Sequence, residues 1–218
     1  MCGRYAFHAE PETVADEFGL GVPPTLTPRY NVAPTQLVAA VGLGADRVTR
    51  GLVRLRWGLV PYWAQSANGP PIANARAESV AWKFGDQFRE KRCLVPASGF
   101  YEWAAVGGKK VGRLFTIPGR PAFGFAGLWD VWDGGDGSRV VSCCVVTTSP
   151  NELVAEVHDR MPVILGRDAY AEWLDPGTPE SRLKELLAPY PADRMAARVV
   201  GPKVNSPRND GPECVEAA

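Results

Sequence analysis

The residues best suited to chemistry stand at the start of the chain, where Cys2 directly follows Met1. Methionine aminopeptidases remove an initiator Met that precedes a residue as small as cysteine, so the mature chain would carry an α-amine and a thiol on one residue. The amine can condense with an aldehyde to a Schiff base, and the thiol can close on the same carbon to form a five-membered thiazolidine. An α-amine has an ordinary pKa of about 7.7–8.0 and a thiol of about 8.5, so both are partly in reactive form near neutral pH. The alternative is that Cys2 is only a small residue at a frayed terminus.

Further segments place polar or aromatic residues between predicted turns, where packing does not require them. Together with the N-terminal segment they are Cys2–Tyr5, Arg29–Thr35, Arg56–Trp63, Asn74–Glu78, Gly99–Trp103, and Thr147–Asn151 followed by His158–Pro162. In this order and spacing, the segments resemble the SRAP family, the SOS response-associated peptidases. The resemblance runs from Cys2 to about Asn205, and it rests on all the motifs in register rather than on any one of them.

The resemblance implies a function in DNA damage. The family forms covalent crosslinks with abasic sites in single-stranded DNA, and an abasic deoxyribose is in equilibrium with an open-chain aldehyde, the electrophile that Cys2 is expected to capture. We therefore expect the protein to shield abasic sites in single-stranded or junction DNA at replication forks, with no metal or cofactor. The family name also implies peptidase activity, which we interpret as self-directed: removal of Met1 or release of the crosslink.

The resemblance also implies roles for individual residues. Cys2 would supply the amine and the thiol, and Asn74 would orient the amine. Glu102 would shuttle the proton that opens the sugar ring and dehydrates the carbinolamine, and His158 would assist formation or reversal of the Schiff base. Taken singly, the last three have ordinary alternatives: a turn or cap residue for Asn74, a solvated strand-edge residue for Glu102, and a histidine at a helix end for His158.

Residues near these motifs are candidates for DNA contacts. Arginines suit phosphate oxygens, hydroxyls donate to them, and indole rings offer stacking faces to bases. The candidates are Arg4, Arg76 and Arg160 for phosphates, Thr148 and Ser149 as hydroxyl donors, and Trp57, Trp63 and Trp103 for stacking. The alternative for Arg160 is an ion pair with Asp159, and the alternative for each tryptophan is core packing.

Short apolar runs separated by turn residues predict a fold dominated by strands. The expected strands are Gln36–Val41, Val48–Trp57, Arg92–Val95, Leu114–Ile117, Ala122–Trp129, Arg139–Thr147, Pro162–Leu165 and Ala197–Val200. The expected helices are Pro11–Phe18, Ala75–Lys83, Pro150–Val157 with Ser149 as its N-cap, Asp168–Leu174 and Pro179–Leu187. This pattern predicts a single α+β domain, residues 1–204, with a curved or barrel-like, mostly antiparallel sheet flanked by short helices. Residues 205–218 are expected to be a flexible tail.

Composition narrows the class of protein further. The chain has 218 residues, a formal net charge of zero and 45% hydrophobic residues, which is typical of a soluble globular protein and not of a generic polyanion binder. No apolar run is long enough to cross a membrane. The five cysteines are odd in number and lack Cys-x-x-Cys spacing, which argues against disulfides and zinc and favours a reducing cytosol. We therefore expect a cytoplasmic monomer that associates with the nucleoid when bound to DNA, and the replication machinery is a candidate partner.

Three competing interpretations remain open at the level of sequence. Class II glutamine amidotransferases also expose a cysteine after Met removal, but the chain shows no Gly-Asp-rich glutamine-binding segment. A thiol peptidase would use Cys2 with His158 and either Asn74 or Glu102. A non-catalytic single-strand binder would not need Cys2 at all.

Overall fold

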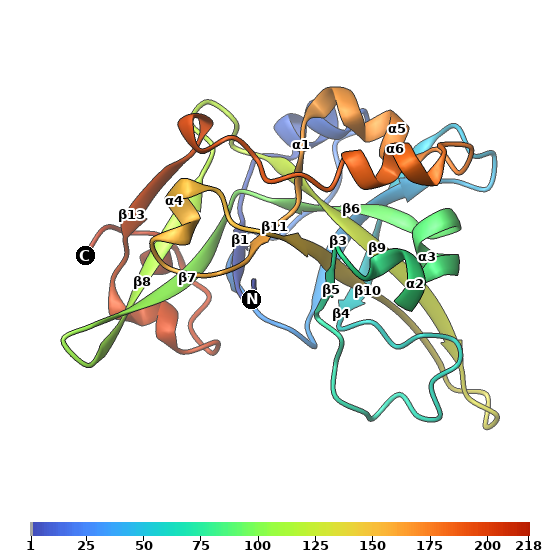
Figure 1. Ribbon diagram of the computed structural model, residues 1–218, viewed down its shortest axis with the longest axis horizontal. Helices are drawn as coiled ribbons and strands as arrows, with labels where there is room; N and C mark the ends of the chain where they lie inside the picture. The colour runs from blue at the N-terminus through green and yellow to red at the C-terminus, as the bar shows by residue number, and fades with distance from the viewer. Residues whose placement is uncertain (1) are drawn as a thin grey trace.

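The computed structural model describes residues 2–218, which form two β-sheets and several short helices (Figure 1). The larger sheet contains a closed ring of five strands, because β9 pairs with both β6 and β10. In order around the ring, the strands are β10 (Arg139–Thr148), β4 (Arg50–Trp57), β3 (Leu37–Leu43), β6 (Arg92–Ala97) and β9 (Phe123–Asp133). Among the five pairs that close this ring, the β4–β10 pair is parallel and the other four are antiparallel. The predicted α+β fold with a barrel-like, mostly antiparallel sheet is confirmed.

Short strands extend this barrel, and a second sheet lies beside it. β5 (Asn74–Arg76) and β11 (Met161–Pro162) pair with β10, and β12 (Ile164–Leu165) pairs with β9. The second sheet is antiparallel, in the order β13 (Ala196–Val199), β8 (Lys109–Thr116), β7 (Gly99–Val106), β1 (Tyr5–Phe7) and β2 (Arg29–Val32). The second sheet and the barrel extensions together carry most of the motif segments.

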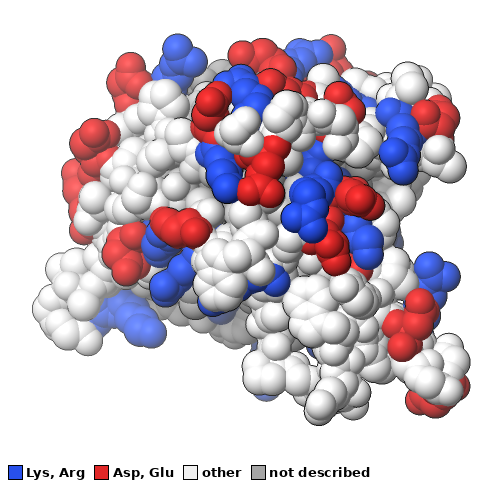
Figure 2. Space-filling view, turned by 45° about the vertical axis from the view of Figure 1, so that its right-hand side comes forward, with Lys and Arg blue, Asp and Glu red and all other residues white. Residues whose placement is uncertain are grey.

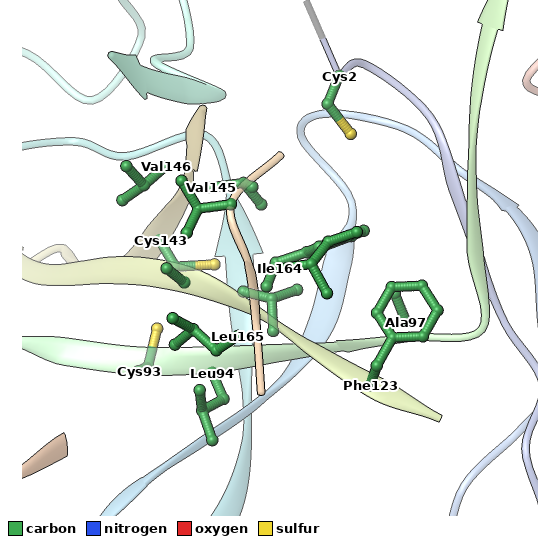
Figure 3. Packing of buried hydrophobic residues seen from close by; sticks show 14 of the residues in the cluster. Cys2, Cys93, Leu94, Ala97, Phe123, Cys143, Val145, Val146, Ile164 and Leu165 are labelled. Carbon is green, nitrogen blue, oxygen red and sulfur yellow. The ribbon is translucent and has the colours of Figure 1, made fainter. Parts of the chain in front are cut away.

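The core lies in and around the barrel, where β6 and residues Ser142–Thr148 of β10 are buried on both faces. Their apolar runs are the pattern expected of strands covered on two sides. Figure 3 shows the thiols of Cys93 and Cys143 within this packing, with Cys2 at the edge of the same cluster and its side chain directed toward it. Close packing also fixes Gly127 in β9, since a Cβ there would lie 2.9 Å from the Cys93 Sγ.

Helices cover the outside of the sheets. They are α1 (Pro11–Phe18), α2 (Val80–Lys83), α3 (Gly85–Glu90), α4 (Glu152–Ala155), α5 (Tyr170–Leu174) and α6 (Glu180–Glu185), with 3₁₀ turns at Arg167–Ala169, Ala192–Arg194, Pro202–Asn205 and Pro212–Cys214. α1 follows its prediction: it has Pro11 in its first turn and ends at Gly19, whose φ of 66° suits glycine. None of the helices within residues 2–218 is long and apolar enough to span a lipid bilayer.

Several predicted elements differ from the structure. The segment Ala75–Lys83 begins inside strand β5 and becomes helical only at Val80, because its first residues pair with β10. The cap of α4 is Asn151, whose side chain accepts a hydrogen bond from the Val154 amide, and not Ser149. The sequence did not predict β1, β2 and β5, which have three or four residues each, or β7, whose apolar run is interrupted by Glu102.

The C-terminal segment 205–218, predicted to be a flexible tail, packs against the second sheet. The Asp210 carboxylate accepts hydrogen bonds of 2.7 Å from the amides of both Tyr30 and Asn31. The buried Asn31 side chain donates to the carbonyls of Val204, Ser206 and Asn209. The polar groups of segment 205–218 take part in these hydrogen bonds with the second sheet, and the prediction of a loose tail was wrong.

We predict that Asn31→Ala lowers the free energy of unfolding by about 2–3 kcal/mol, because it removes the buried side-chain donor to three carbonyls and the Oδ1 that accepts from Arg4. Urea unfolding followed by circular dichroism measures the change. Asn68→Ala, at an exposed position whose side chain makes no hydrogen bond within residues 2–218, is the matched control. Equal stability of the two variants would show that Asn31 does not hold the segment.

Candidate active site

Cys2 lies three residues before the start of β1 at Tyr5, and the pairing of β1 with β7 positions it. Tyr5 pairs with Phe100, and the Tyr101 amide donates to the Arg4 carbonyl at 3.0 Å. Continuing this antiparallel register sets Glu102 opposite Gly3, next to Cys2. The Cys2 side chain is fully buried. Burial, and then the nearby Glu102 carboxylate, raise the pKa of the Cys2 thiol well above its ordinary value, so the thiol keeps its proton near neutral pH.

Glu102 is a buried carboxyl group on β7, with 4% of its surface exposed. Burial raises its pKa to about 7, and the Asp159 carboxylate also favours the protonated form. Near neutral pH the group is therefore divided between acid and carboxylate. A carboxyl group in this state can both give and accept a proton, which is the property expected of an acid–base catalyst.

Asn74 connects the barrel to Cys2. It opens β5, where it pairs with Val145 of β10, and its Nδ2 donates to the Cys2 carbonyl at 2.9 Å. Its Oδ1 is buried and has no hydrogen-bond partner among residues 2–218. A buried amide oxygen without a partner is costly, so this atom is suited to receive an additional donor at the site.

His158 follows α4 and lies on the other side of β10 from Asn74, since β11 follows closely after it. Its Nδ1 accepts a hydrogen bond of 3.0 Å from the Arg160 amide, which sets the neutral ring with its proton on Nε2. Partial burial lowers the pKa of His158. The Asp159 carboxylate is 2.9 Å from the same Nδ1, a contact that becomes an ion pair when the ring is protonated. His158 is therefore neutral at pH 7 and has a partner ready for its cationic form.

The end of β10 brings these segments together. Thr147 pairs with Arg76 of β5 on one edge and with Pro162 of β11 on the other. The Asn74 motif and the His158 motif are thus neighbours of the same strand, and the Asn74 hydrogen bond adds Cys2 from the second sheet. The Asp159 carboxylate favours the protonated form of Glu102, and the Glu102 carboxylate raises the pKa of the Cys2 thiol, so the three groups lie within electrostatic range of one another.

Two of the predicted phosphate-binding arginines lie beside this site. Arg76 and Arg160 line a cleft of about 450 Å³ together with Glu78 and Asp159. Arg76 is exposed, whereas Arg160 forms a two-pronged ion pair with Glu78, at 2.6 and 3.0 Å, and also donates to the Thr147 carbonyl. The partner of Arg160 is therefore Glu78 and not Asp159. Glu78 is the last residue of the Asn74–Glu78 motif, but its ion pair with Arg160 was not predicted from the sequence.

The third arginine and two other candidates already make contacts within the protein. Arg4 donates to Asn31 and to the Val204 carbonyl, and its guanidinium lies 5.6 Å from the centre of the Trp103 ring. The Trp103 indole N–H donates to Asn205 Oδ1. Thr148 is almost completely buried, whereas Ser149 beside it is exposed. Figure 2 shows basic and acidic side chains intermixed over the face that it displays.

The two tryptophans of the Arg56–Trp63 segment have different positions. Trp57 is 1% exposed and its indole N–H donates to the Ala73 carbonyl, so it cannot offer a face to a base. Its prediction as a stacking residue was wrong, because Trp57 points into the barrel from β4 as Leu55 does two residues earlier. Trp63 lies in the loop after β4 and is half exposed.

Comparisons with known proteins show the family to which the chain belongs. The model of the SOS response associated peptidase (SRAP) family matches residues 1–207. This chain belongs to the SRAP family. The match includes every motif residue described above and confirms the resemblance found in the sequence.

Relatives of this SRAP protein carry informative names. The abasic site processing protein YoqW of Bacillus subtilis (strain 168) is 39% identical over 225 residues, which cover the whole of both chains. The abasic site processing protein HMCES of Gallus gallus is 32% identical over 199 residues, covering 78% of this chain and 59% of that protein. A crystal structure of a protein from Bacteroides thetaiotaomicron superposes with a TM-score of 0.86 over the full length of both chains, at 26% identity.

We predict that Trp57→Ala and Trp63→Ala have very different effects on the stability of this SRAP domain. Loss of the buried Trp57 ring leaves a cavity and should lower the free energy of unfolding by about 3–5 kcal/mol. Loss of the half-exposed Trp63 ring should lower it by at most about 1 kcal/mol. Urea unfolding of both variants is the measurement, and equal losses would contradict the assignment of Trp57 to the core.

Proposed function

We propose that this SRAP protein captures abasic sites in single-stranded or junction DNA as a thiazolidine on Cys2, and so shields the lesion at the replication fork. The observation that carries the proposal is the 2.9 Å hydrogen bond from Asn74 to the Cys2 carbonyl, beside a Glu102 carboxyl group whose pKa burial raises to about 7. The names of the curated relatives support the same lesion as the substrate.

The first step uses the amine of Cys2. Removal of Met1 frees this nitrogen, and we assign Asn74 Oδ1 to accept one of its hydrogens, because that oxygen has no partner among residues 2–218. A neutral amide holds the amine without stabilising the ammonium form as a carboxylate would. The amine adds to the sugar aldehyde to give a carbinolamine. Protonated Glu102 then gives its proton to the hydroxyl group, which leaves as water and generates a protonated imine.

The second step closes the ring with the thiol. Because burial raises the pKa of Cys2, Sγ still carries its hydrogen when the imine forms. Glu102, now ionised, accepts this hydrogen as Sγ bonds to the imine carbon and the C=N electron pair returns to nitrogen. Each turnover thus makes one C–N and one C–S bond, releases one water and returns Glu102 to its starting form. His158 serves as the second acid–base group in formation and reversal of the imine.

The DNA strand would be held by the residues that remain accessible around this site. Three of the candidates are exposed: Arg76 and Ser149 would contact phosphates, and Trp63 would stack on a base. Arg160 would leave Glu78 for a phosphate, and the remaining candidates Arg4, Thr148 and Trp103 contribute through smaller exposed surfaces. Stacking and phosphate contacts carry little sequence preference, which suits a protein that must find lesions in any sequence.

The burial of Cys2 bears on the competing interpretations. A thiol peptidase or an amidohydrolase attacks with a thiolate, and burial disfavours that form at Cys2. In the proposed mechanism the amine attacks first, and the thiol gives its proton to Glu102 only as it adds to the imine. This sequence needs no free thiolate. We therefore retain peptidase chemistry only in the self-directed sense of Met1 removal or crosslink release.

We predict that Cys2→Ala abolishes the heat-stable crosslink to single-stranded DNA containing one abasic site. Alanine also permits removal of Met1, so the variant keeps its amine and should form only an imine, detectable after trapping with borohydride. Cys2→Ser should give at most a less stable adduct. Denaturing gels measure the outcome, with Cys214→Ala as the matched thiol control. A heat-stable crosslink in Cys2→Ala at the wild-type yield would overturn the proposal.

We also predict a bell-shaped dependence of the crosslinking rate on pH. The rate should rise as the Cys2 amine loses its proton and fall as Glu102, with its pKa raised to about 7, loses the proton needed for dehydration. The maximum should lie at about pH 7–8. Glu102→Gln should slow the reaction by about 10²–10⁴-fold and remove the falling limb. Rapid-quench kinetics between about pH 5.5 and about pH 9 measure both features. An unchanged pH profile in Glu102→Gln would exclude Glu102 as the proton donor.

A further inference from the structure

The most exposed tryptophan of the protein has no role in the site described so far. Trp82 on helix α2 exposes 73% of its surface, compared with 50% for Trp63. The fold does not need this ring, because α2 is anchored through the fully buried Val80 and followed by the buried Phe84. A single exposed apolar residue is ordinary on a protein surface, so the surroundings of Trp82 decide its meaning.

Trp82 forms one side of an aromatic and basic cleft. The cleft has a volume of about 330 Å³ and is lined by Trp63, Trp82, Lys83 and Arg89, with Gln87 and Asp86 among the remaining residues. The Lys83 ammonium lies 5.0 Å from the centre of the Trp82 ring. Indole faces next to cations are the combination that binds unpaired nucleotides, because the ring stacks on a base while the cation meets the phosphate.

The same lysine also belongs to the cleft beside Asn74. Lys83 lines the cleft of about 450 Å³ that contains Arg76, Asp159 and Arg160. Lys83 therefore joins the two clefts, one next to the site and one between the two tryptophans. A strand held at Arg76 can continue past Lys83 and present its next unpaired bases to Trp82.

The charges along this path favour a polyanion. Asp86 is paired with Arg89 at 2.9 Å, and Glu78 is paired with Arg160. Lys83 forms no ion pair with any other residue in the described range 2–218, and neither does Arg76. Asp159 also lines this cleft, and its partner His158 is neutral, so the uncompensated charges where the two clefts meet are the cations Arg76 and Lys83 against one carboxylate. The net charge there is positive, which favours contact with a phosphate backbone.

The cleft is also held in a fixed shape. The fully buried Asp130 accepts hydrogen bonds from the Tyr62 amide at 2.8 Å, from Gln87 and from Lys91. These contacts tie the loop that carries Trp63 to helix α3 and to strand β9. A preformed cleft binds without the cost of ordering its walls.

We propose that Trp82 and Lys83 form a second contact surface for the DNA strand, in which the Trp82 ring stacks on a base several nucleotides from the lesion and Lys83 binds the intervening phosphate. This inference rests on the proposed function, since it assumes that the strand reaches the site at Cys2. Trp82 is a positioning residue: it increases the affinity for longer strands and does not touch the reacting atoms.

Fluorescence anisotropy tests the surface with labelled oligonucleotides that carry a tetrahydrofuran analogue of the abasic sugar, which has no aldehyde and cannot crosslink. An oligonucleotide with long single-stranded flanks is compared with a trinucleotide centred on the analogue. Trp82→Ala should weaken binding of the long strand about tenfold and leave the trinucleotide unchanged, and Trp82→Phe should restore most of the loss. Val48→Ala, at an exposed valine in the β3–β4 turn, is the remote control. A long-strand Kd within twofold of wild type in Trp82→Ala would overturn the proposal.

The salt dependence separates the contribution of Lys83. Lys83→Gln should reduce the slope of log K against log salt by about 0.7, the value for one phosphate on a single strand. An unchanged slope would remove Lys83 from the contact and break the path between the clefts. Crosslinking of a true abasic oligonucleotide at saturating concentration should be unaffected in Trp82→Ala. If the wild-type protein forms no crosslink but Trp82→Ala still loses affinity for the long strand, the proposed function fails and the contact surface stands. If the wild-type protein forms the crosslink but Trp82→Ala binds the long strand like wild type, only the contact surface is rejected.

Discussion

The hydrogen bond from Asn74 to the Cys2 carbonyl is the constraint on which the site depends. A chain terminus is ordinarily the least ordered part of a domain, and a nucleophile located there has no fixed direction of attack. In this protein the pairing of β1 with β7 fixes the backbone from one sheet, and Asn74 fixes it from the other. Two anchors from different sheets thus give the proposed nucleophile Cys2 a fixed position in the site.

Strand β10 supplies the frame for this arrangement. Its first part closes the barrel against β4 and β9, and its last residues receive β5 on one edge and β11 on the other. The burial of Cys143 to Val146 makes this strand rigid, because apolar packing on both faces leaves no room for a shift of register. The motifs of Asn74 and His158 inherit their relative position from a strand that carries no proposed catalytic group itself.

The sequence predicted the barrel strands and the site residues for different reasons. Long apolar runs such as that of β10 predict a strand directly. In contrast, β1 has only three residues, β2 and β5 are short and contain Arg and Asn, and the run of β7 is interrupted by Glu102. Their residues were found through the motif pattern, without their structure. The burial of Trp57 could have been predicted, since Leu55 and Trp57 share one face of an alternating strand. The packing of residues 205–218 could not, because polar side chains such as Asp210 bind backbone groups that no local pattern reveals.

The most direct test of the account is intact-protein mass spectrometry of the purified chain, before and after mixing with single-stranded DNA that contains one abasic site. The account predicts a chain without Met1, followed by an adduct whose mass is the sum of protein and DNA less one water. Cyanoborohydride should leave that mass unchanged, because a thiazolidine has no C=N bond to reduce. A processed chain that forms no adduct, or an adduct that gains two hydrogens on reduction, would contradict the capture of the lesion by both the amine and the thiol of Cys2.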